Sequence, residues 1–245
     1  MPHDIRIGTA GWSFPRALPD FPAEDTGLER YAAVFDCVEI NSSFYRPHQR
    51  KTYERWAAST PANFRFAVKV PKAITHERRL ADIAEPLARF LDECGGLGEK
   101  LGPLLIQLPP SLKLDTGLVE RFLTGWRQAT SAASVLEPRH VSWFTPEADA
   151  LLAAFEIARV AADPAVVPEA AEPGGWPGLV YRRLHGSPVI YESAYGAAAL
   201  ATLAGRLKDE AKTAQTWTVF DNTKFGAATT DALAVMALTL PRPKR

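Results

Sequence analysis

The chain has 245 residues, of which 47% are hydrophobic and 23% charged, and its 28 basic side chains equal its 28 acidic ones. This length suits one large domain or two small ones, with enough apolar material for a buried core. A net charge of zero argues against a protein that coats nucleic acid through a basic surface. The composition also excludes collagen-like, disordered and coiled-coil proteins.

Eight short runs with β-strand character recur along the chain, and their spacing of roughly 20 to 40 residues is typical of βα units. They are Ile5–Thr9, Asp36–Asn41, Phe64–Val70, Pro103–Leu108, Ser134–Arg139, Ile157–Asp163, Leu179–His185 and Thr216–Asn222. Apolar residues three and four apart predict amphipathic helices between them. The predicted buried faces include Leu28, Tyr31, Ala32 and Phe35; Leu118, Phe122 and Leu123; Leu200, Leu203, Ala204 and Leu207; and Leu233, Met236 and Ala237.

This alternation predicts an α/β fold, namely a single (β/α)8 TIM-type barrel over residues 1–245. A doubly wound sheet is the alternative, but neither G-x-G-x-x-G nor a Walker A sequence is present. The stretch from Asp163 to Gly178 is rich in proline and glycine, which disfavour a long helix. We therefore expect a shortened or irregular sixth crossover.

Polar residues occur near the carboxyl ends of the predicted strands, where (β/α)8 barrels form their active sites. Strand alternation turns Val38 and Ile40 toward the helices and Glu39 and Asn41 toward the interior. The other ends supply Lys69, Gln107, Glu137, Arg139, Asp163, Arg183, His185, Asp221 and Asn222. Because ionisable side chains are rarely buried without partners, two explanations remain open. The residues form a ligand site, or they form salt bridges that close the barrel, such as Lys69 with Glu39 and Arg139 with Glu137.

Aromatic and basic residues in the loops extend this candidate site. Trp12, Tyr45, Trp143 and Tyr195 can stack on a sugar ring or a base, whereas Phe14, Phe44 and Phe144 are expected to cover the barrel top. His76 and His140, beside Arg78, Arg79 and Arg139, predict an anion site.

Cysteine content and the absence of targeting signals suggest where the protein works. Cys37 and Cys94 are too few for a disulfide framework, and Cys37 is expected to be a small buried thiol. The first residues lack a secretory signal, and no segment has the roughly 18 to 20 consecutive apolar residues that cross a bilayer. We expect a cytoplasmic protein that binds a small-molecule substrate, with no membrane attachment and no bulk binding of nucleic acid. The oligomeric state stays open.

Six segments give the chain a family resemblance: Ile7–Ser13, Val38–Arg46, Phe64–Lys69, Leu101–Ser111, Arg139–Phe144 and Arg183–Gly186. On these the sequence resembles the YecE-like proteins, a family classed as domain of unknown function seventy-two. The resemblance runs from about Ile5 to about Leu233 and implies a TIM-type barrel, but it implies no reaction.

The chain departs from the family pattern at three positions. Pro138 separates Glu137 from Arg139, and Asp221 and Asp231 stand where relatives usually have asparagine. The extra carboxylates predict a ligand chemistry that differs from that of the relatives.

Three functions are compatible with these residues. The first is an enzyme that acts on a small anionic or polyhydroxylated compound, phosphorylated compounds included, with Glu39, Glu137, Asp163 and His185 as acids and bases. In that interpretation Lys69, Arg139 and Arg183 stabilise negative charge. The full set of expected ligand-binding residues is Trp12, Asn41, Tyr45, Lys69, His76, Gln107, Arg139, Trp143, Arg183, Tyr195, Asp221 and Asn222. Glycoside hydrolysis by Glu39 and Glu137 is one such chemistry.

The second function is a metal-dependent hydrolase or isomerase. Glu39, Glu137, Asp163, His185 and Asp221 supply oxygen and nitrogen donors suited to magnesium, manganese or zinc. No residue pattern requires a cofactor, so a divalent metal stays an alternative. The third function is a non-catalytic module that binds an anionic metabolite through the basic and aromatic residues alone.

Overall fold

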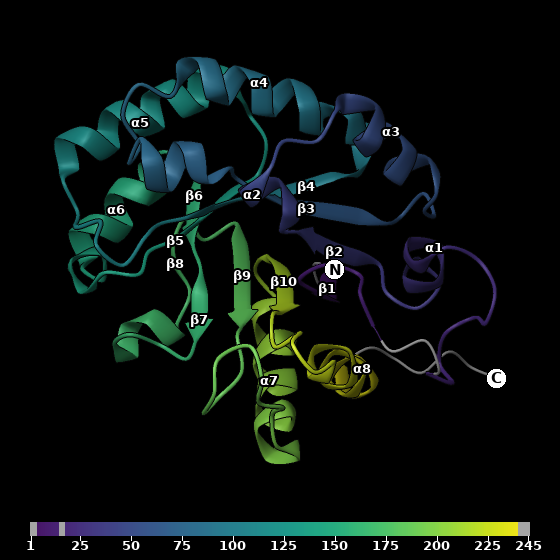
Figure 1. Cartoon of the computed structure of the whole chain (residues 1–245). Coiled ribbons are helices and arrows are strands. Elements are labelled where there is room, and N and C mark those ends of the chain that lie inside the picture. The colour runs from purple at the N-terminus through teal and green to yellow at the C-terminus, as the bar shows by residue number, and fades with distance from the viewer. Residues whose placement is uncertain (1–3, 15–17, 240–245) are drawn as a thin grey trace.

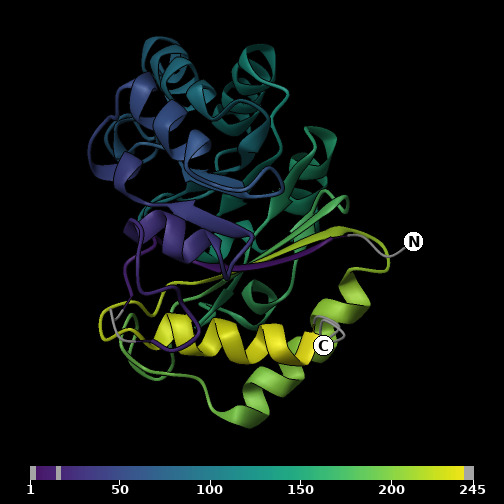
Figure 2. The same ribbon diagram turned by 90° about the vertical axis from the view of Figure 1, so that its right-hand side faces the viewer.

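The strands of the computed structural model, which describes residues 4–14 and 18–239, are short and have helices on their outer side (Figures 1 and 2). The strands are β1 Ile5–Thr9, β2 Cys37–Ile40, β3 Arg65–Lys69, β4 Leu101–Gln107, β5 Ser134–Glu137, β6 Ile157–Arg159, β7 Ala161–Asp163, β8 Gly174–Gly175, β9 Leu179–Leu184 and β10 Gln215–Phe220. The α-helices are α1 Gly27–Ala32, α2 Ser42–Tyr45, α3 Arg50–Ala58, α4 Ala84–Cys94, α5 Thr116–Ala129, α6 Pro146–Ala154, α7 Ala197–Glu210 and α8 Ala227–Thr239. The α/β class is confirmed.

The strands form two sheets, with the orders β1-β10-β9-β7 and β2-β3-β4-β5-β6-β8. All pairs are parallel except β6 with β8. The predicted strand Ile157–Asp163 is divided at Val160, so that β6 lies in one sheet and β7 in the other. At the opposite junction, an isolated parallel bridge joins Ala10, directly after β1, to Glu39 on β2.

The predicted irregular crossover is present between β7 and β9. It contains a 3-10 turn at Pro168–Ala171 and the two-residue strand β8, which pairs antiparallel with β6. The prolines and glycines of this stretch limit helix formation. As a result, the outer face of β7 and β9 is covered by α7 and the 3-10 turn rather than by a full crossover helix (Figure 1).

Capping residues in the sequence fix where several helices begin. Thr26 and Glu29 form a reciprocal capping box at α1, and the Thr145 side chain accepts from the amide of Ala148 at the start of α6. Pro146 then occupies the first turn of α6, where its missing amide hydrogen is not needed. These caps satisfy amide groups that have no partner inside the helix.

Alternate residues of the strands pack into two hydrophobic clusters. Outward-facing residues such as Val38, Phe66 and Leu136 pack with the helices in the larger cluster. Inward-facing residues from both sheets form a smaller cluster that we call the inner apolar layer: Cys37, Ala67, Leu105, Val135, Ala158, Val160, Leu179, Tyr181, Trp217 and Val219. Burial raises the pKa of the Cys37 thiol well above its usual range, which agrees with the expected buried thiol.

The helix faces agree with the sequence pattern except in α8. Leu200, Leu203, Ala204 and Leu207 of α7 are all buried, as predicted. In α8 the prediction is confirmed for Leu233 and Met236, which pack against the core, and wrong for Ala237, which is exposed; Ala228, Ala232 and Val235 are buried as well. Since α8 is apolar on several sides, its periodicity does not select one face. None of the helices within residues 4–14 and 18–239 combines the length and apolarity needed to cross a membrane.

Candidate functional site

Arg183 on β9 is the centre of a buried ionic cluster at the carboxyl ends of the strands. Its guanidinium donates to Glu39 from Nε (3.1 Å to Oε2) and from Nη2 (2.7 Å to Oε1). It also donates from Nη1 to Oε2 of Glu137 (2.7 Å) and from Nη2 to Oδ2 of Asp221, which follows β10 (2.9 Å). Arg183, Glu39 and Glu137 are fully buried. One cation therefore joins three carboxylates contributed by both sheets.

Strand alternation explains why these side chains meet. Glu39, Glu137 and Arg183 each follow a residue of the inner apolar layer by two positions, and two positions restore the same face of a strand. They therefore form the next layer toward the carboxyl ends, as the sequence predicts. The hydroxyl of Tyr181 connects the two layers by donating to Oε2 of Glu39 (2.8 Å). Burial and the Glu39 charge raise the pKa of Tyr181 well above its usual range, so it stays a donor.

His185 bridges two of the carboxylates. Its Nδ1 lies 3.0 Å from Oδ2 of Asp221, and its Nε2 lies 3.3 Å from Oε1 of Glu137 and 2.8 Å from Nη2 of Arg139. Arginine nitrogens only donate, so the contact with Arg139 requires Nε2 to accept and the ring proton to be on Nδ1, toward Asp221. A hydrogen bond to Glu137 instead requires a proton on Nε2. Arg139 also forms an ion pair with Glu137, as the sequence predicts.

The charges in the cluster keep two of its carboxyl groups ionised. Burial alone raises the pKa of Glu137, but Arg183, Arg139 and His185 outweigh it and hold that pKa well below its usual range. Burial likewise opposes ionisation of Asp221. The pKa of this carboxyl group is nevertheless lowered by Arg183, His185 and Lys69. Both side chains are therefore carboxylates at neutral pH.

Lys69, at the end of β3, is buried beside this cluster but is not paired with it. The side chain is 7% exposed, and its Nζ lies 4.3 Å from the centre of the Phe44 ring. Within residues 4–14 and 18–239 the ammonium has neither a hydrogen bond nor an ion pair with a protein group. The predicted salt bridge between Lys69 and Glu39 is therefore wrong, because Arg183 and Tyr181 occupy both oxygens of Glu39. Burial and the Arg183 charge lower the pKa of Lys69 to about 8.

Gln107 and His76 lie around this centre. Oε1 of Gln107 accepts from Nη1 of Arg183 at 3.4 Å, and Gln107 is partly exposed. The ring of His76 packs edge-on against Phe44 with 4.9 Å between centres, and its Nδ1 lies 2.8 Å from the Thr75 hydroxyl. Burial and the Lys69 charge lower the pKa of His76. His76 is thus close enough to Lys69 to interact with it electrostatically.

Tyr191 is a candidate residue that the sequence prediction did not include. Its ring is edge-on to His185 with 5.8 Å between centres, and the residue is 48% exposed. Its backbone has a φ of 69°, a left-handed conformation that is unfavourable for a bulky residue. No sequence signal distinguishes Tyr191 from Tyr195, because the loop conformation after β9 decides which ring turns toward His185.

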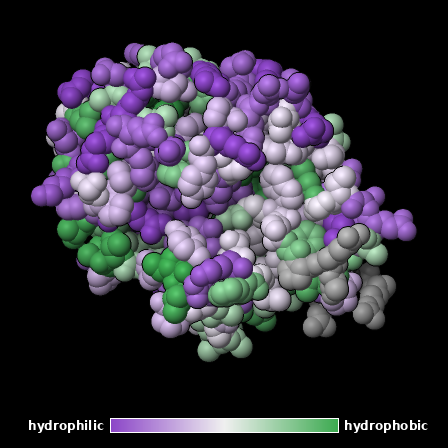
Figure 3. All heavy atoms as spheres, viewed as in Figure 1, coloured by the Kyte–Doolittle hydropathy of each residue, from purple (hydrophilic) through white to green (hydrophobic). Residues whose placement is uncertain are grey.

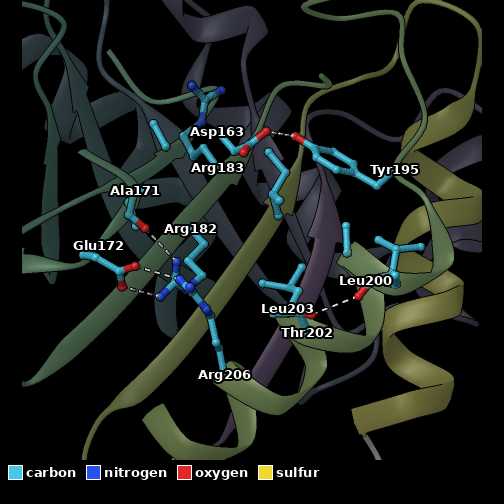
Figure 4. Close-up of a pocket in the computed structure, with 15 residues that line it drawn as sticks. Asp163, Ala171, Glu172, Arg182, Arg183, Tyr195, Leu200, Thr202, Leu203 and Arg206 are labelled. Carbon is cyan, nitrogen blue, oxygen red and sulfur yellow. Dashed lines mark hydrogen bonds and ion pairs between the residues drawn. The ribbon is translucent and has the colours of Figure 1, made fainter. Parts of the chain in front are cut away.

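Asp163 and Tyr195 pair with each other outside the ionic cluster. The Tyr195 hydroxyl donates to Oδ1 of Asp163 (2.7 Å) and accepts from the amide of Gly186 (2.9 Å). Figure 4 shows this pair at one end of a cavity of about 450 Å³ between β7, β9 and α7. The amide of His185 donates to the backbone carbonyl of Asp163 (2.7 Å), but in the part of the chain that the structure describes the Asp163 carboxylate has no bond to the side chains of Glu39, Glu137 or His185. The prediction that all four acid–base groups converge is wrong for Asp163.

Two other predicted ligand-binding residues have structural partners instead. Trp143 is fully buried, and its Nε1 donates to the carbonyl of Leu112 (2.9 Å). Asn222 is also fully buried and turned toward α8, where its side-chain nitrogen donates to Oδ2 of Asp231 (2.7 Å) and to the carbonyl of Ser193 (2.9 Å). The prediction for Trp143 is therefore wrong. Oδ1 of Asn222 is buried without a hydrogen-bond partner among the described residues, so its role in ligand binding stays a prediction.

The remaining aromatic and polar candidates lie at the margin of the site. Tyr45 is 72% exposed and packs edge-on against Phe44. Trp12 packs edge-on against Trp56 with 5.1 Å between centres and, with Asn41, lines a shallow groove. Oδ1 of Asn41 is buried without a hydrogen-bond partner in the described part of the chain. None of the three contacts Arg183 or His185 among the residues that the structure describes.

The predicted anion site around the loop histidines does not form. Arg78 donates to the carbonyl of Asp82 (2.7 Å), and Arg79 donates to the side chain and carbonyl of Ser111 (3.0 Å each). His140 caps the 3-10 turn Val141–Trp143 by accepting from the Ser142 amide (3.1 Å). These residues hold loops in place, and Arg139 joins the ionic cluster instead.

The donors expected for a divalent metal are arranged around a cation. Guanidinium nitrogens of Arg183 lie within 3.1 Å of oxygens of Glu39, Glu137 and Asp221. Across residues 4–14 and 18–239, no three His, Cys, Asp or Glu side chains are grouped so that they could hold a metal ion. The cluster in this arrangement is an ion-pair network rather than a ligand set for a metal.

Figure 3 shows that the upper part of the face seen in Figure 1, over α3 to α5, is mainly hydrophilic, whereas hydrophobic side chains are more frequent toward α7.

The parallel strands with outer helices and the charged strand ends define an α/β protein with a candidate ligand site at the carboxyl ends of its strands. A solved DUF72 family protein from Enterococcus faecalis V583 superimposes with a TM-score of 0.82 at 22% identity, covering 99% of both chains. One from Thermotoga maritima MSB8 gives 0.80 at 25% identity, covering 96% of this chain and 99% of that one.

The family described as "Protein of unknown function DUF72" matches residues 6–244, so the chain belongs to this family. The UPF0759 protein YecE of Escherichia coli K12 is 33% identical over 105 residues, which are 43% of this chain and 38% of YecE. The UPF0759 protein YunF of Bacillus subtilis 168 is 28% identical over 149 residues, 58% of this chain and 53% of YunF. The matches therefore span less than two thirds of these relatives. The family resemblance drawn from the six sequence segments is confirmed.

Proposed function

We propose that the two sheets form one (β/α)8-type barrel within a single domain of residues 1–245, with an enzyme active site at the carboxyl ends of the strands. Two junctions support this arrangement: the bridge between Ala10 and Glu39, and the passage of the chain from one sheet to the other at Val160. The inner apolar layer, which draws residues from both sheets, also supports it. Both cysteines are free and buried, which supports a reducing compartment such as the cytoplasm.

The proposed reaction uses acid–base chemistry on a small anionic or polyhydroxylated substrate, phosphorylated compounds included. The observation that carries this proposal is His185 held between Asp221 and Glu137, next to the unpaired Lys69. An imidazole in contact with two carboxylates is suited to move a proton, and a buried amine is suited to exchange one near neutral pH. Glu39 and Arg183 position the cluster, because Arg183 and Tyr181 use both oxygens of Glu39 and Arg183 holds three carboxylates together.

The energetics favour a functional role for the cluster. Moving an ion out of water costs several kcal/mol even in a relaxed protein site, and ion pairing only partly offsets that cost. Apolar side chains stabilise a buried position at least as well, as they do in the inner apolar layer of the same strands. The partly exposed side of the cluster supports an anionic substrate. Arg139 and Gln107 are partly accessible to solvent there, and the Lys69 amine has no ion pair.

The test compares turnover and binding in a Glu137→Gln variant. Purified protein is incubated with a panel of sugar phosphates, hydroxy acids and keto acids, turnover is followed by proton NMR, and binding by calorimetry. We expect wild-type protein to convert at least one compound. The variant should bind that compound but convert it about a hundredfold more slowly, since one proton acceptor is lost. Glu54→Gln, on the exposed face of α3, is the matched control and should behave as wild type.

Two results separate the alternatives. Full turnover by Glu137→Gln contradicts the acid–base role of the cluster. Binding without turnover by wild-type protein across the panel instead favours the non-catalytic metabolite-binding module.

A further inference from the structure

Lys69 differs from the other lysines of the described chain in being buried without a hydrogen bond or ion pair for its ammonium group. Lys72 pairs with Glu77, and Lys100 donates to the carbonyls of Ala57 and Thr60. Lys51, Lys113 and Lys208 are exposed to solvent. Among lysines within residues 4–14 and 18–239, only Lys69 is buried. It is buried beside three carboxylates that bond to Arg183, and none of them forms an ion pair with Lys69 among the described residues.

This environment makes Lys69 a nucleophile at physiological pH. Amines attack carbonyl carbons in the neutral form, and removing the ammonium from water next to a guanidinium favours that form. With a pKa of about 8, about one tenth of Lys69 is neutral at pH 7, whereas an ordinary lysine is neutral in less than about one part in a thousand. The Phe44 ring covers Nζ from one side and limits the access of water to a covalent adduct.

We propose that Lys69 forms a Schiff base with an aldehyde or ketone substrate. The Nζ–carbon bond forms as the amine attacks the carbonyl carbon, and the resulting carbinolamine loses its hydroxyl group as water. In total, the lysine ammonium and the carbonyl compound give an iminium ion and one water molecule, and the water takes two of the three ammonium protons. This inference rests on the proposed function and narrows its substrate to carbonyl compounds.

The surrounding charges suit the product as well as the reactant. The iminium ion has the same charge as the ammonium, so Glu39, Glu137 and Asp221 stabilise it as they stabilise Lys69. Its cationic group also keeps a place beside the Phe44 ring. Arg139, which is partly exposed beside His185, favours a substrate that also carries an anionic group.

The test traps the adduct by reduction. Wild-type protein is incubated at pH 7 with glyoxylate, pyruvate, glycolaldehyde phosphate or propanal in the presence of cyanoborohydride, and modified lysines are located by peptide mass spectrometry. We expect at least one compound to label Lys69 at least about tenfold faster than the exposed lysines, because of its larger neutral fraction. Lys69→Met should lose this fast label, and Lys72→Met should keep it, since Lys72 is an exposed lysine of the following loop.

Labelling that follows exposure, with Lys51 and Lys113 modified and Lys69 unmodified for all four compounds, overturns the inference. The same mixtures without the reductant are assayed for turnover by wild type and Glu137→Gln. Glu137-dependent turnover without a Lys69 adduct removes the Schiff base and leaves the acid–base function standing. A Lys69 adduct without any turnover confirms the covalent step and contradicts the proposed catalysis.

Discussion

The inner apolar layer and the ionic cluster lie on the same strands, two residues apart, yet one consists of uncharged side chains and the other of charged ones. Cys37, Val135 and Tyr181 pack without charges, and Glu39, Glu137 and Arg183 follow them by two residues. Both layers are fully buried at these positions. Burial alone therefore does not determine which residue type is used.

The difference shows that stability and chemistry are separated along the strands. The apolar layer gains free energy from removing hydrocarbon from water, whereas the cluster depends on Arg183 to offset the desolvation of three carboxylates. Lys69 lies beside the cluster, and its ammonium has no hydrogen bond or ion pair within the described residues. An unpaired cation is unfavourable for stability, so its place at the strand ends points to a role in binding or reaction.

The largest expected effect is from Arg183→Met, which removes the shared cation. Glu39, Glu137 and Asp221 lose their common partner, and we expect the free energy of unfolding to fall by about 3 to 5 kcal/mol at pH 7. The pKa values of Glu137 and Asp221 are lowered by folding, so their stabilisation is present at neutral pH and is lost as the pH falls through the lowered values. The variant lacks most of this acid-dependent loss. Urea denaturation at a series of pH values from 7 down to about 2.5 measures both effects.

Arg206→Met is the matched control for this experiment. Arg206 forms an exposed ion pair with Glu172 on the surface, and such pairs contribute about 1 kcal/mol or less. Equal destabilisation by the two substitutions contradicts the central role of Arg183.

The next largest effect has the opposite sign. Lys69→Met replaces an unpaired buried ammonium, and we expect the free energy of unfolding to rise by about 3 kcal/mol at pH 7. The pKa of Lys69 in the folded protein, about 8, is lower than the pKa of a free lysine. The free energy of unfolding of the wild type should therefore increase as the pH rises from 8 to the pKa of free lysine. The variant should lack this increase. Thermal and urea denaturation across this range measure it. Lys72→Met should show no such gain, and a loss of stability in Lys69→Met contradicts the interpretation.

A smaller effect is expected in the apolar layer. Val135→Ala removes buried hydrocarbon beneath Glu137, and the free energy of unfolding should fall by about 2 kcal/mol, independent of pH between about 5 and 8. Val166→Ala, at a position that is half exposed, is the control and should change stability by less than about 0.5 kcal/mol. A pH-dependent loss in Val135→Ala shows that the two layers are not independent.

The smallest stability effect is from Arg139→Met at the exposed margin of the cluster. Glu137 keeps Arg183 as a partner, so the free energy of unfolding should fall by about 1 kcal/mol or less. Anion binding should weaken about tenfold, because Arg139 is the partly exposed guanidinium beside His185. Calorimetric titration with glyoxylate measures this change, and an unchanged affinity removes Arg139 from the ligand site.

Much of the site could be predicted because strand alternation follows directly from the sequence. The two-residue period placed Glu39, Glu137 and Arg183 on one face and at one end, and these residues do meet. The partners of each side chain could not be predicted, because they come from distant segments. Arg183 occupies Glu39 in place of Lys69, and Asp231 on α8 draws Asn222 away from the site.

Loop residues were the least predictable part. Trp143 is buried because a 3-10 turn directs its ring toward the carbonyl of Leu112, and no periodic pattern reports such a turn. Asp163 is at the end of β7, but its side chain accepts a hydrogen bond from Tyr195 in the loop between β9 and α7. The conformations of these loops depend on long-range packing rather than on local sequence.

The pairing of β1 with β10 also constrains the order of folding. Ile5 is paired with Thr216, so the first strand finds its neighbour about 210 residues later in the chain. During synthesis β1 emerges early and must wait for β10, whereas β2 and β3 can pair as soon as both have emerged. Glu39 and Glu137 are therefore synthesised long before Arg183. Their carboxylates stay hydrated until the last third of the chain has been synthesised and can bury them.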